Sequence, residues 1–256
     1  AIDASTERRL NGLRIWNIAV GLVLAVQAAA VAVLTNDFSL PVIGTFMEGP
    51  PGSDPGMHHL FDIPTGWGVF AFLAISAGAL LTIGGPAFGW YKRNLLLNRN
   101  YGRWIEYFFS SSIMIVLIAQ ICGISDIAAL MAIFGVNASM ILFGLLMEKY
   151  EEPGKPNWLS FWFGCFAGII PWIGIVVYVV APGVEASPPG FVYGIIVSLF
   201  LFFNCFAVNM VLQYKKVGPW RDYLFGEKAY IVLSLTAKAL LAWQVFANVL
   251  VSDQLS

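Results

Sequence analysis

The chain has 256 residues, of which 59% are hydrophobic and 11% charged, and its formal net charge is −1. Soluble domains carry about 25% charged residues, so this composition excludes an ordinary soluble protein and predicts an integral membrane protein in contact with membrane lipid. The near-neutral charge, without a basic patch, argues against a nucleic-acid partner. The three cysteines, Cys122, Cys165 and Cys205, fall in separate apolar stretches, which favours buried thiols over a disulfide framework or a metal site.

Seven apolar stretches are long enough to cross a bilayer as helices. They occupy about residues 12–34, 65–89, 102–122, 125–147, 157–181, 189–214 and 228–251. The sequence therefore predicts an all-α membrane protein whose residues 1–256 form a single domain, a seven-transmembrane-helix bundle. Ser125 is expected to cap the fourth helix.

The connection between the first two stretches, residues 35–64, is much longer than the others. Its FSLPVIGTF segment partly alternates between apolar and polar positions, which favours a short β-hairpin. Connections of this length usually carry a function or their own structure, so we expect a lid or a contact between two copies. His58 and His59 lie here without a third ligand, so they are expected to be surface residues and no metal site is predicted.

Basic residues gather on one side of the predicted bundle. Thirteen of the fourteen Lys and Arg residues precede the first stretch or lie in or beside the connections after the second, fourth and sixth. Cytoplasmic loops are enriched in these residues, so we predict a multi-pass protein of the cell membrane with a cytoplasmic N-terminus and an extracellular C-terminus. The basic connections are candidates for binding anionic lipid or a soluble cytoplasmic partner. The fourteenth basic residue is Lys238.

Lys238 lies in the middle of the last apolar stretch, AYIVLSLTAKALLAWQVFANVLV. About ten residues separate it from Lys228, so its depth is ~15 Å, near the middle of a ~30 Å hydrocarbon core. The side chain is too short to reach water from there, and a buried ammonium is costly unless it is paired or chemically altered. Lys238 therefore requires a partner or a modification.

Glu106 is the predicted partner, because it lies one to two turns inside the third stretch, in GRWIEYFFSSSIMIVL. The other acidic residues fall in connections or at helix ends; Glu148 is one of these and is expected to be solvated. Ser234, four residues before Lys238, lies on the same helix face and can hydrogen-bond there. Three interpretations stay open: a structural ion pair, an ion path, and a Schiff base between the amine and an aldehyde, with Glu106 neutralising the protonated imine.

Seven helices, a lysine at mid-depth in the last of them and R-x-x-E near the start of the third resemble the microbial-type rhodopsins, which bind retinal. RWIEY followed by SSS, then SLTAKALLAWQ, with the inverted orientation and the long first extracellular connection, resembles the heliorhodopsins in particular. The resemblance extends over essentially the whole chain. It implies all-trans retinal attached to Lys238 as a protonated Schiff base, with Glu106 as the counterion and Ser234 as a hydrogen-bond partner.

The resemblance also implies which side chains surround the retinal. They are Tyr107, Ser110, Ser111 and Met114 on the third helix, Asn137, Met140, Ile141 and Gly144 on the fourth, Trp162 and Phe166 on the fifth, Phe203 and Phe206 on the sixth, and Trp243 on the seventh. Independently of the family, the fourth-helix residues follow an i, i+3, i+4, i+7 spacing and so share one helix face.

One feature departs from the family, whose members commonly carry two histidines inside the bundle that are implicated in proton movement after illumination. Here Leu24 and the run ISAGALL occupy those positions, so a released proton must go to Glu106, water or another acceptor. No second carboxylate is predicted at depth towards the outside. The outer half is therefore expected to be dry, which disfavours a continuous ion path.

Together with the resemblance, this pattern predicts a non-pumping light sensor that signals through a conformational change driven by photoisomerisation. A homodimer is also expected, with the long first connection and the fourth helix as contacts. The alternatives are a light-driven proton transporter of the same fold and a retinal-free seven-helix carrier or scaffold. The sequence shows no nucleophile–base pair, HExxH motif or phosphate-binding loop, so an enzyme is not expected.

Overall fold

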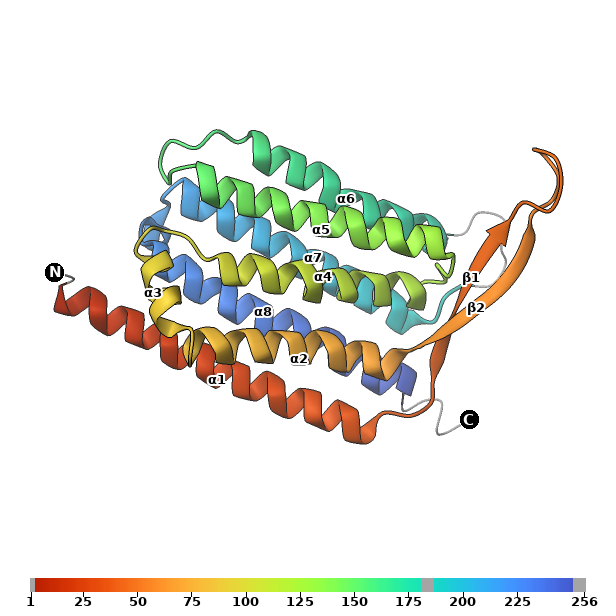
Figure 1. Ribbon diagram of the computed structural model, residues 1–256, viewed down its shortest axis with the longest axis horizontal. Helices are drawn as coiled ribbons and strands as arrows, with labels where there is room; N and C mark the ends of the chain where they lie inside the picture. The colour runs from red at the N-terminus through yellow and green to blue at the C-terminus, as the bar shows by residue number, and fades with distance from the viewer. Residues whose placement is uncertain (1–2, 181–186, 251–256) are drawn as a thin grey trace.

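The computed structural model describes residues 3–180 and 187–250 (Figure 1). Within them, seven helices are long and apolar enough to cross a membrane. They are α1 (Ala4–Leu34), α2 (Thr65–Gly84), α4 (Tyr101–Ile121), α5 (Ile127–Tyr150), α6 (Leu159–Val180), α7 (Gly190–Tyr214) and α8 (Tyr223–Val245), which the π-helical turn Phe246–Leu250 continues. The predicted seven-helix bundle of a multi-pass membrane protein is confirmed. The predicted helix ends at residues 181 and 251 lie outside the described residues.

The bundle has two distinct ends, because successive membrane helices run in opposite directions (Figure 1). We call the end with the N-terminus and the connections α2–α4, α5–α6 and α7–α8 the basic end, and the opposite end the hairpin end. α1 packs against α2 and α8, α4 lies between α2 and α5, and α6 and α7 pack against α5 and α8 respectively. The core of the bundle is therefore formed around α4 and α8.

Polar caps, which hydropathy does not detect, set several helix ends. Asp3 caps α1 at residue 4 rather than 12, because the polar residues 4–11 continue the helix beyond its apolar part. Asp126, and not Ser125, caps α5 by accepting two backbone N–H groups of its first turn. The prediction for Ser125 was wrong: its carbonyl instead accepts the Ile43 N–H at 2.9 Å.

The predicted second stretch, 65–89, divides into two helices. α2 ends at Gly84, the chain turns through Gly85 and Pro86, and the short helix α3 (Phe88–Leu95) follows. Proline has no backbone N–H and restricts the residue before it, so this pair ends the helix. α3 is tied to α1 by an ion pair between Lys92 and Glu7, with Nζ and Oε1 2.5 Å apart.

The predicted hairpin is confirmed as two antiparallel strands, β1 (Ser39–Phe46) and β2 (Gly56–Pro64). The register shifts between Val42 and Ile43, as in a β-bulge. Val42 is fully buried, and the adjacent Ile43 bonds to the α4–α5 connection, so the base of the hairpin is fixed to the bundle. The rest of the hairpin extends beyond the helices (Figure 1).

Among the described residues, no group of three or more His, Cys, Asp or Glu side chains could hold a metal ion. On the hairpin, His58 Nε2 is 2.7 Å from Glu48 and His59 Nε2 is 2.9 Å from Asp62, and both histidines are exposed as expected. The cysteines are unpaired, but Cys205 is exposed, which corrects the expectation of buried thiols. Its helix α7 is apolar on most sides, so the sequence pattern does not indicate which face is buried.

Candidate functional site

Lys238 of α8 and Glu106 of α4 meet inside the bundle. The Lys238 Nζ is 3.2 Å from Oε1 of Glu106, and both side chains are buried. Long helical side chains lean toward the N-terminus of their helix, so Lys238 points back toward the basic end, over Ser234. Its amine donates a hydrogen bond of 2.6 Å to the Ser234 hydroxyl. The structure thus brings these three predicted residues together.

Ser76 of α2 is a fourth member of this group, and the sequence analysis did not identify it. Its hydroxyl lies 2.5 Å from Oε1 of Glu106, the same oxygen that faces Lys238. A cation and a hydroxyl at one oxygen stabilise negative charge there. The available signal was a single hydroxyl in the run ISAGALL, which the sequence analysis considered only for its lack of a histidine.

A cavity of about 380 Å³ adjoins Lys238 and is enclosed by α4, α5, α6, α7 and α8. Pockets for small organic ligands are commonly about 300–1,000 Å³ and mostly apolar. The predicted residues that line it are Tyr107, Ser111, Met114, Met140, Ile141, Gly144, Phe203, Phe206, Ser234 and Lys238. Aromatic side chains that were not predicted complete the lining, among them Trp104, Phe161, Trp172, Phe200 and Tyr230.

Trp162 and Phe166 require a correction, because the structure places them outside the cavity. They are 64% and 71% exposed on the outer face of α6. Phe161 and Cys165, one position earlier, line the cavity instead. α6 is hydrophobic around most of its circumference, so the sequence could not fix its rotation, and an error of one residue turns a side chain by about 100°.

Three further predicted residues also lie outside the lining. Ser110 is fully buried within the bundle, and Asn137 donates a 2.9 Å hydrogen bond to Ser111, so it positions a residue that does line the cavity. Trp243 is 38% exposed and its indole N–H donates to Gln27 of α1 at 3.0 Å. That hydrogen bond holds the Trp243 ring against α1 and away from the cavity.

Comparisons with known proteins agree with this geometry. The profile of the heliorhodopsin family matches residues 13–250, nearly the whole chain. This chain belongs to the heliorhodopsin family. Membership implies a retinal rhodopsin, and no curated protein matches the chain.

Solved structures show the same fold at low identity. A light-driven proton pump, the rhodopsin of Coccomyxa subellipsoidea, aligns with a TM-score of 0.63 and 18% identity, covering 93% of this chain and 96% of that one. Cyanorhodopsin from the cyanobacterium Tolypothrix sp. aligns with a TM-score of 0.58 and 12% identity, covering 97% and 96%. At these identities the likeness establishes the microbial-rhodopsin fold alone.

The residues of this heliorhodopsin suit a retinal. The cavity offers one primary amine, Lys238, in a lining that is mostly aromatic and aliphatic, as expected for an aldehyde with a long apolar tail. Two glycines make room for bulky lining groups. A Cβ on Gly144 would lie 2.4 Å from the Trp104 ring, and a Cβ on Gly168 would lie 2.4 Å from the Met140 sulfur.

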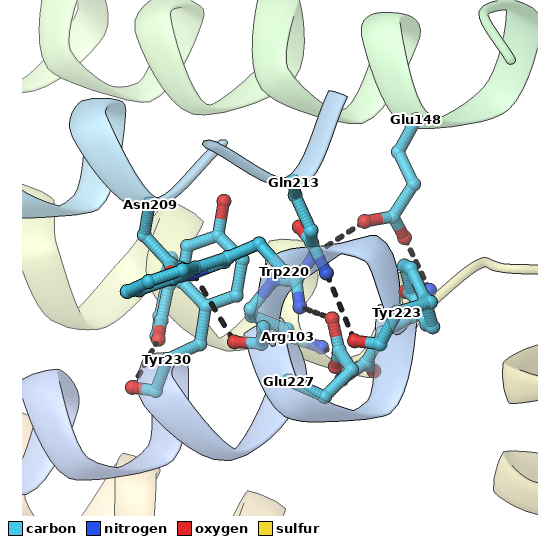
Figure 2. A network of polar contacts seen from close by, with 11 residues as sticks. Arg103, Glu148, Asn209, Gln213, Trp220, Tyr223, Glu227 and Tyr230 are labelled. Carbon is cyan, nitrogen blue, oxygen red and sulfur yellow. Dashed lines mark hydrogen bonds and ion pairs between the residues drawn. The ribbon is translucent and has the colours of Figure 1, made fainter. Parts of the chain in front are cut away.

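A second buried charged group, drawn in Figure 2, lies near the N-terminal ends of α4 and α8, between this site and the basic end. Arg103 of α4 forms ion pairs with Glu148 of α5 and Glu227 of α8. Asn100 donates its backbone N–H to Glu148 and its side-chain amide, at 2.7 Å, to Glu227. We call these four residues the Arg103 cluster. The expectation of a solvated Glu148 was wrong, because Arg103 and Asn100 replace water around its buried carboxylate.

Two aromatic rings connect the Arg103 cluster with the cavity of about 380 Å³ beside Lys238, which we call the main cavity. The Arg103 guanidinium lies 4.0 Å from the centroid of the Tyr230 ring and 4.8 Å from that of Trp104. Both rings also line the cavity beside Lys238. The same two rings therefore contact both the cavity and the guanidinium.

Proposed function

We propose that this protein is a non-pumping light sensor that holds all-trans retinal on Lys238. The observation that carries the proposal is the buried amine beside an apolar cavity, with the Glu106 carboxylate 3.2 Å away. Retinal bound there as a protonated imine would supply absorption of visible light and isomerisation. Glu106 and Ser234 would stabilise the positive charge on the nitrogen, and the aromatic lining would restrict the ligand.

The distribution of charge supports a sensor over a pump. Among the described residues, the buried carboxylates, Glu106, Glu148 and Glu227, all lie between Lys238 and the basic end. Buried polar side chains nearer the hairpin end, such as Gln120, are uncharged. A pump needs groups that exchange protons on both sides of the attachment site. Here they are found on one side, and this supports a cycle without net transport.

We also propose that the basic end faces the cytoplasm, where its connections would contact a soluble partner or anionic lipid. The basic connections support this orientation through the preference of cytoplasmic loops for Lys and Arg. The Arg103 cluster reaches these connections, because Asn100 lies in the α2–α4 connection and Glu148 lines a cavity among them, so a change at Lys238 would reach this surface over a short path.

The attachment site is tested by the colour of the purified protein after addition of retinal. Wild-type protein is expected to become coloured and to bleach with hydroxylamine under light, whereas Lys238→Ala stays colourless. Lys228→Ala is the matched control, because its amine lies near the basic end over the Trp16 ring rather than in the cavity. A colourless wild-type protein would favour the retinal-free carrier or scaffold.

Transport is tested separately, with the protein in sealed vesicles. The proposal predicts only transient pH signals on illumination, since the half of the core toward the hairpin end offers no buried carboxylate among the described residues. A steady light-driven pH difference would instead establish the alternative function, a proton transporter. The Coccomyxa rhodopsin, a light-driven proton pump, has the same fold, but its 18% identity does not decide between the two functions.

A further inference from the structure

A second, much smaller cavity of about 20 Å³ lies between Glu106 and the Arg103 cluster. We call it the polar chamber. Its lining includes Asn17, Asn100, Arg103, Glu106, Glu227 and Ser234. A cavity of about 10–15 Å³ accommodates a water molecule when several polar groups surround it. The polar chamber meets both conditions.

Two side chains at the polar chamber carry buried polar atoms without a normal hydrogen bond. Asn17 of α1 is fully buried, and neither its amide nitrogen nor its amide oxygen is bonded. The Tyr91 hydroxyl is close enough to interact with this amide, yet the two do not form a hydrogen bond of normal geometry. The Nε of Arg103 is also unbonded. Buried polar atoms are almost always satisfied by protein or ordered water, so these atoms indicate a water site.

With both carboxylates ionised, the Arg103 cluster carries one more negative than positive charge. Two carboxylates, Glu148 and Glu227, share the single guanidinium of Arg103, which leaves one excess negative charge in a buried site. An uncompensated buried charge is costly, and one added proton removes it. Among the described residues, the other titratable side chains that interact most strongly with these groups are hydroxyls, which carry no positive charge: Tyr91, Tyr107, Tyr214, Tyr223 and Tyr230. The basic side chains of Arg99, Lys149, Lys216 and Arg221 line the cavity on the outer side of Glu148.

We propose that Glu227, together with Glu148, is a proton-binding site that communicates with Glu106 through water in the polar chamber. The inference rests on the proposed function and deepens it. Both histidines of this chain lie in the hairpin, so the proton acceptor inside the bundle must be another group. The proton balance is simple. The proton leaves Nζ of Lys238, Glu106 and chamber water pass it on, and an oxygen of Glu227 accepts it; the reverse path restores the starting state.

A third cavity indicates where such a proton can exchange with solvent. It has a volume of about 430 Å³, lies among the connections of the basic end, and is lined by Glu148, Gln213, Trp220 and Tyr223 (Figure 2). Its rim includes exposed residues such as Arg221. The Arg103 cluster therefore separates the polar chamber from this outer cavity, and a proton that enters and leaves through it stays on one side of Lys238.

Infrared difference spectra of the pigment, illuminated minus dark, test the proposal. Wild-type protein is expected to gain the carbonyl band of a protonated carboxylic acid, and Glu227→Gln is expected to lose it. Asp54→Asn, which changes an exposed carboxylate of the hairpin outside all three cavities, is the control and keeps the band. Persistence of an unchanged band in Glu227→Gln would overturn the assignment.

Asn17→Leu tests the water path without altering a carboxylate. The leucine removes the polar amide from the chamber, so the light-induced band is expected to disappear while the protein remains coloured. Asn94→Leu is its control, because that exposed amide on α3 bonds only to the Trp90 carbonyl. A band of wild-type size and rate in Asn17→Leu would exclude the chamber as the route. This variant also serves if Glu227→Gln does not fold.

A measurement on retinal-free protein separates failure of this site from failure of the proposed function. On acidification, wild-type protein is expected to show the same carboxylic-acid band, reduced in Glu227→Gln, where Glu148 alone matches the charge of Arg103. Equal bands in both proteins would contradict proton binding by the cluster, whether or not retinal binds. If acidification gives different bands in the retinal-free wild-type and Glu227→Gln proteins, but illumination of the wild-type pigment gives no band, then Glu227 does not accept the proton released by light.

Discussion

The two halves of the bundle, divided at Lys238, differ in what fills their cores. Toward the basic end the core contains Glu106, the Arg103 cluster and polar cavities. Toward the hairpin end it is built from tightly packed aliphatic side chains, such as Ile115, Leu117 and Ile118 of α4. A displaced charge is stabilised by dipoles and counter-charges and is repelled from an apolar medium. The buried groups that can respond to a charge change at Lys238 therefore lie toward the basic end.

The two halves also contribute differently to the stability and to the function of the protein. The aliphatic half stabilises the fold through close packing, whereas buried ion pairs contribute little net stability compared with apolar side chains. The Arg103 cluster is therefore poorly explained as a device for stability alone. It is better explained by its position between the polar chamber and the outer cavity.

The largest loss of stability is expected from Arg103→Gln, in the half toward the basic end. The substitution leaves two buried carboxylates without a cation, which costs about 3–5 kcal/mol when one partner of a buried pair is removed. Thermal unfolding and the half-life of the colour in detergent measure the loss. Arg99→Gln is the control, because Arg99 only donates to the Lys149 carbonyl near the surface. Equal stability of the two variants would show that the cluster carries no charge requirement.

Glu106→Gln is expected to move the absorption maximum of the pigment with a protonated imine to longer wavelength. A carboxylate beside the nitrogen favours positive charge at that position, and its loss lets the charge spread away from Lys238. Ser76→Ala, which removes only the hydroxyl 2.5 Å from the same oxygen, should give a smaller shift. Absorption spectra of the three proteins provide the measurement. Identical spectra would remove Glu106 from the role of counterion.

Comparison of these halves also shows how far the sequence could predict the molecule. Hydropathy predicts the seven helices because long apolar runs have few alternatives in a membrane. It predicts Lys238 because this residue lies in the middle of such a run, and Glu106 because it lies one to two turns inside another. Arg103, Glu148 and Glu227 were missed because each lies within a few residues of a helix end, where counting along the chain indicates solvent. Only packing between helices shows that these ends are buried.

The rotation of each helix was predictable only where polar and apolar faces alternate. On α5 the spacing from Asn137 to Gly144 identified the inward face, although Asn137 itself bonds to Ser111 rather than lining the cavity. On α6 nearly every face is apolar, and the choice of Trp162 and Phe166 was wrong by one position. A membrane removes the amphipathic signal that orients helices in soluble proteins.

Gly144→Ala sharpens the comparison at the boundary between the main cavity and the basic half. The added methyl group would lie 2.4 Å from the Trp104 ring, so the ring must move toward the cavity or toward Arg103. Overpacking of this kind costs about 1–3 kcal/mol. We expect lower stability and slower uptake of retinal, followed by thermal unfolding and by the growth of colour. Gly135→Ala, on the same helix with open space around its Cα, should leave both unchanged; an equal loss there would contradict the packing argument.

The smallest effect on stability is expected at the hairpin, where we propose a contact between two copies, with α5 as a second contact. Met57 is 70% exposed on β2, far from every charged group of the core, so Met57→Lys should change stability by less than about 0.5 kcal/mol. It should nevertheless convert a dimer to a monomer in mild detergent, because a lysine resists burial against an apolar partner surface. Light scattering provides the measurement.

His58→Lys is the control for the hairpin, because adjacent strand residues point to opposite faces and the new amine can still pair with Glu48. A monomeric wild-type protein, or dissociation in both variants, would remove the Met57 face as the contact. The absorption maximum adds a second test of the same variants. Since no buried charged side chain among the described residues lies in the core near the hairpin end, Met57→Lys should keep the wild-type spectrum, and a shift would mean that the two ends of the bundle are coupled.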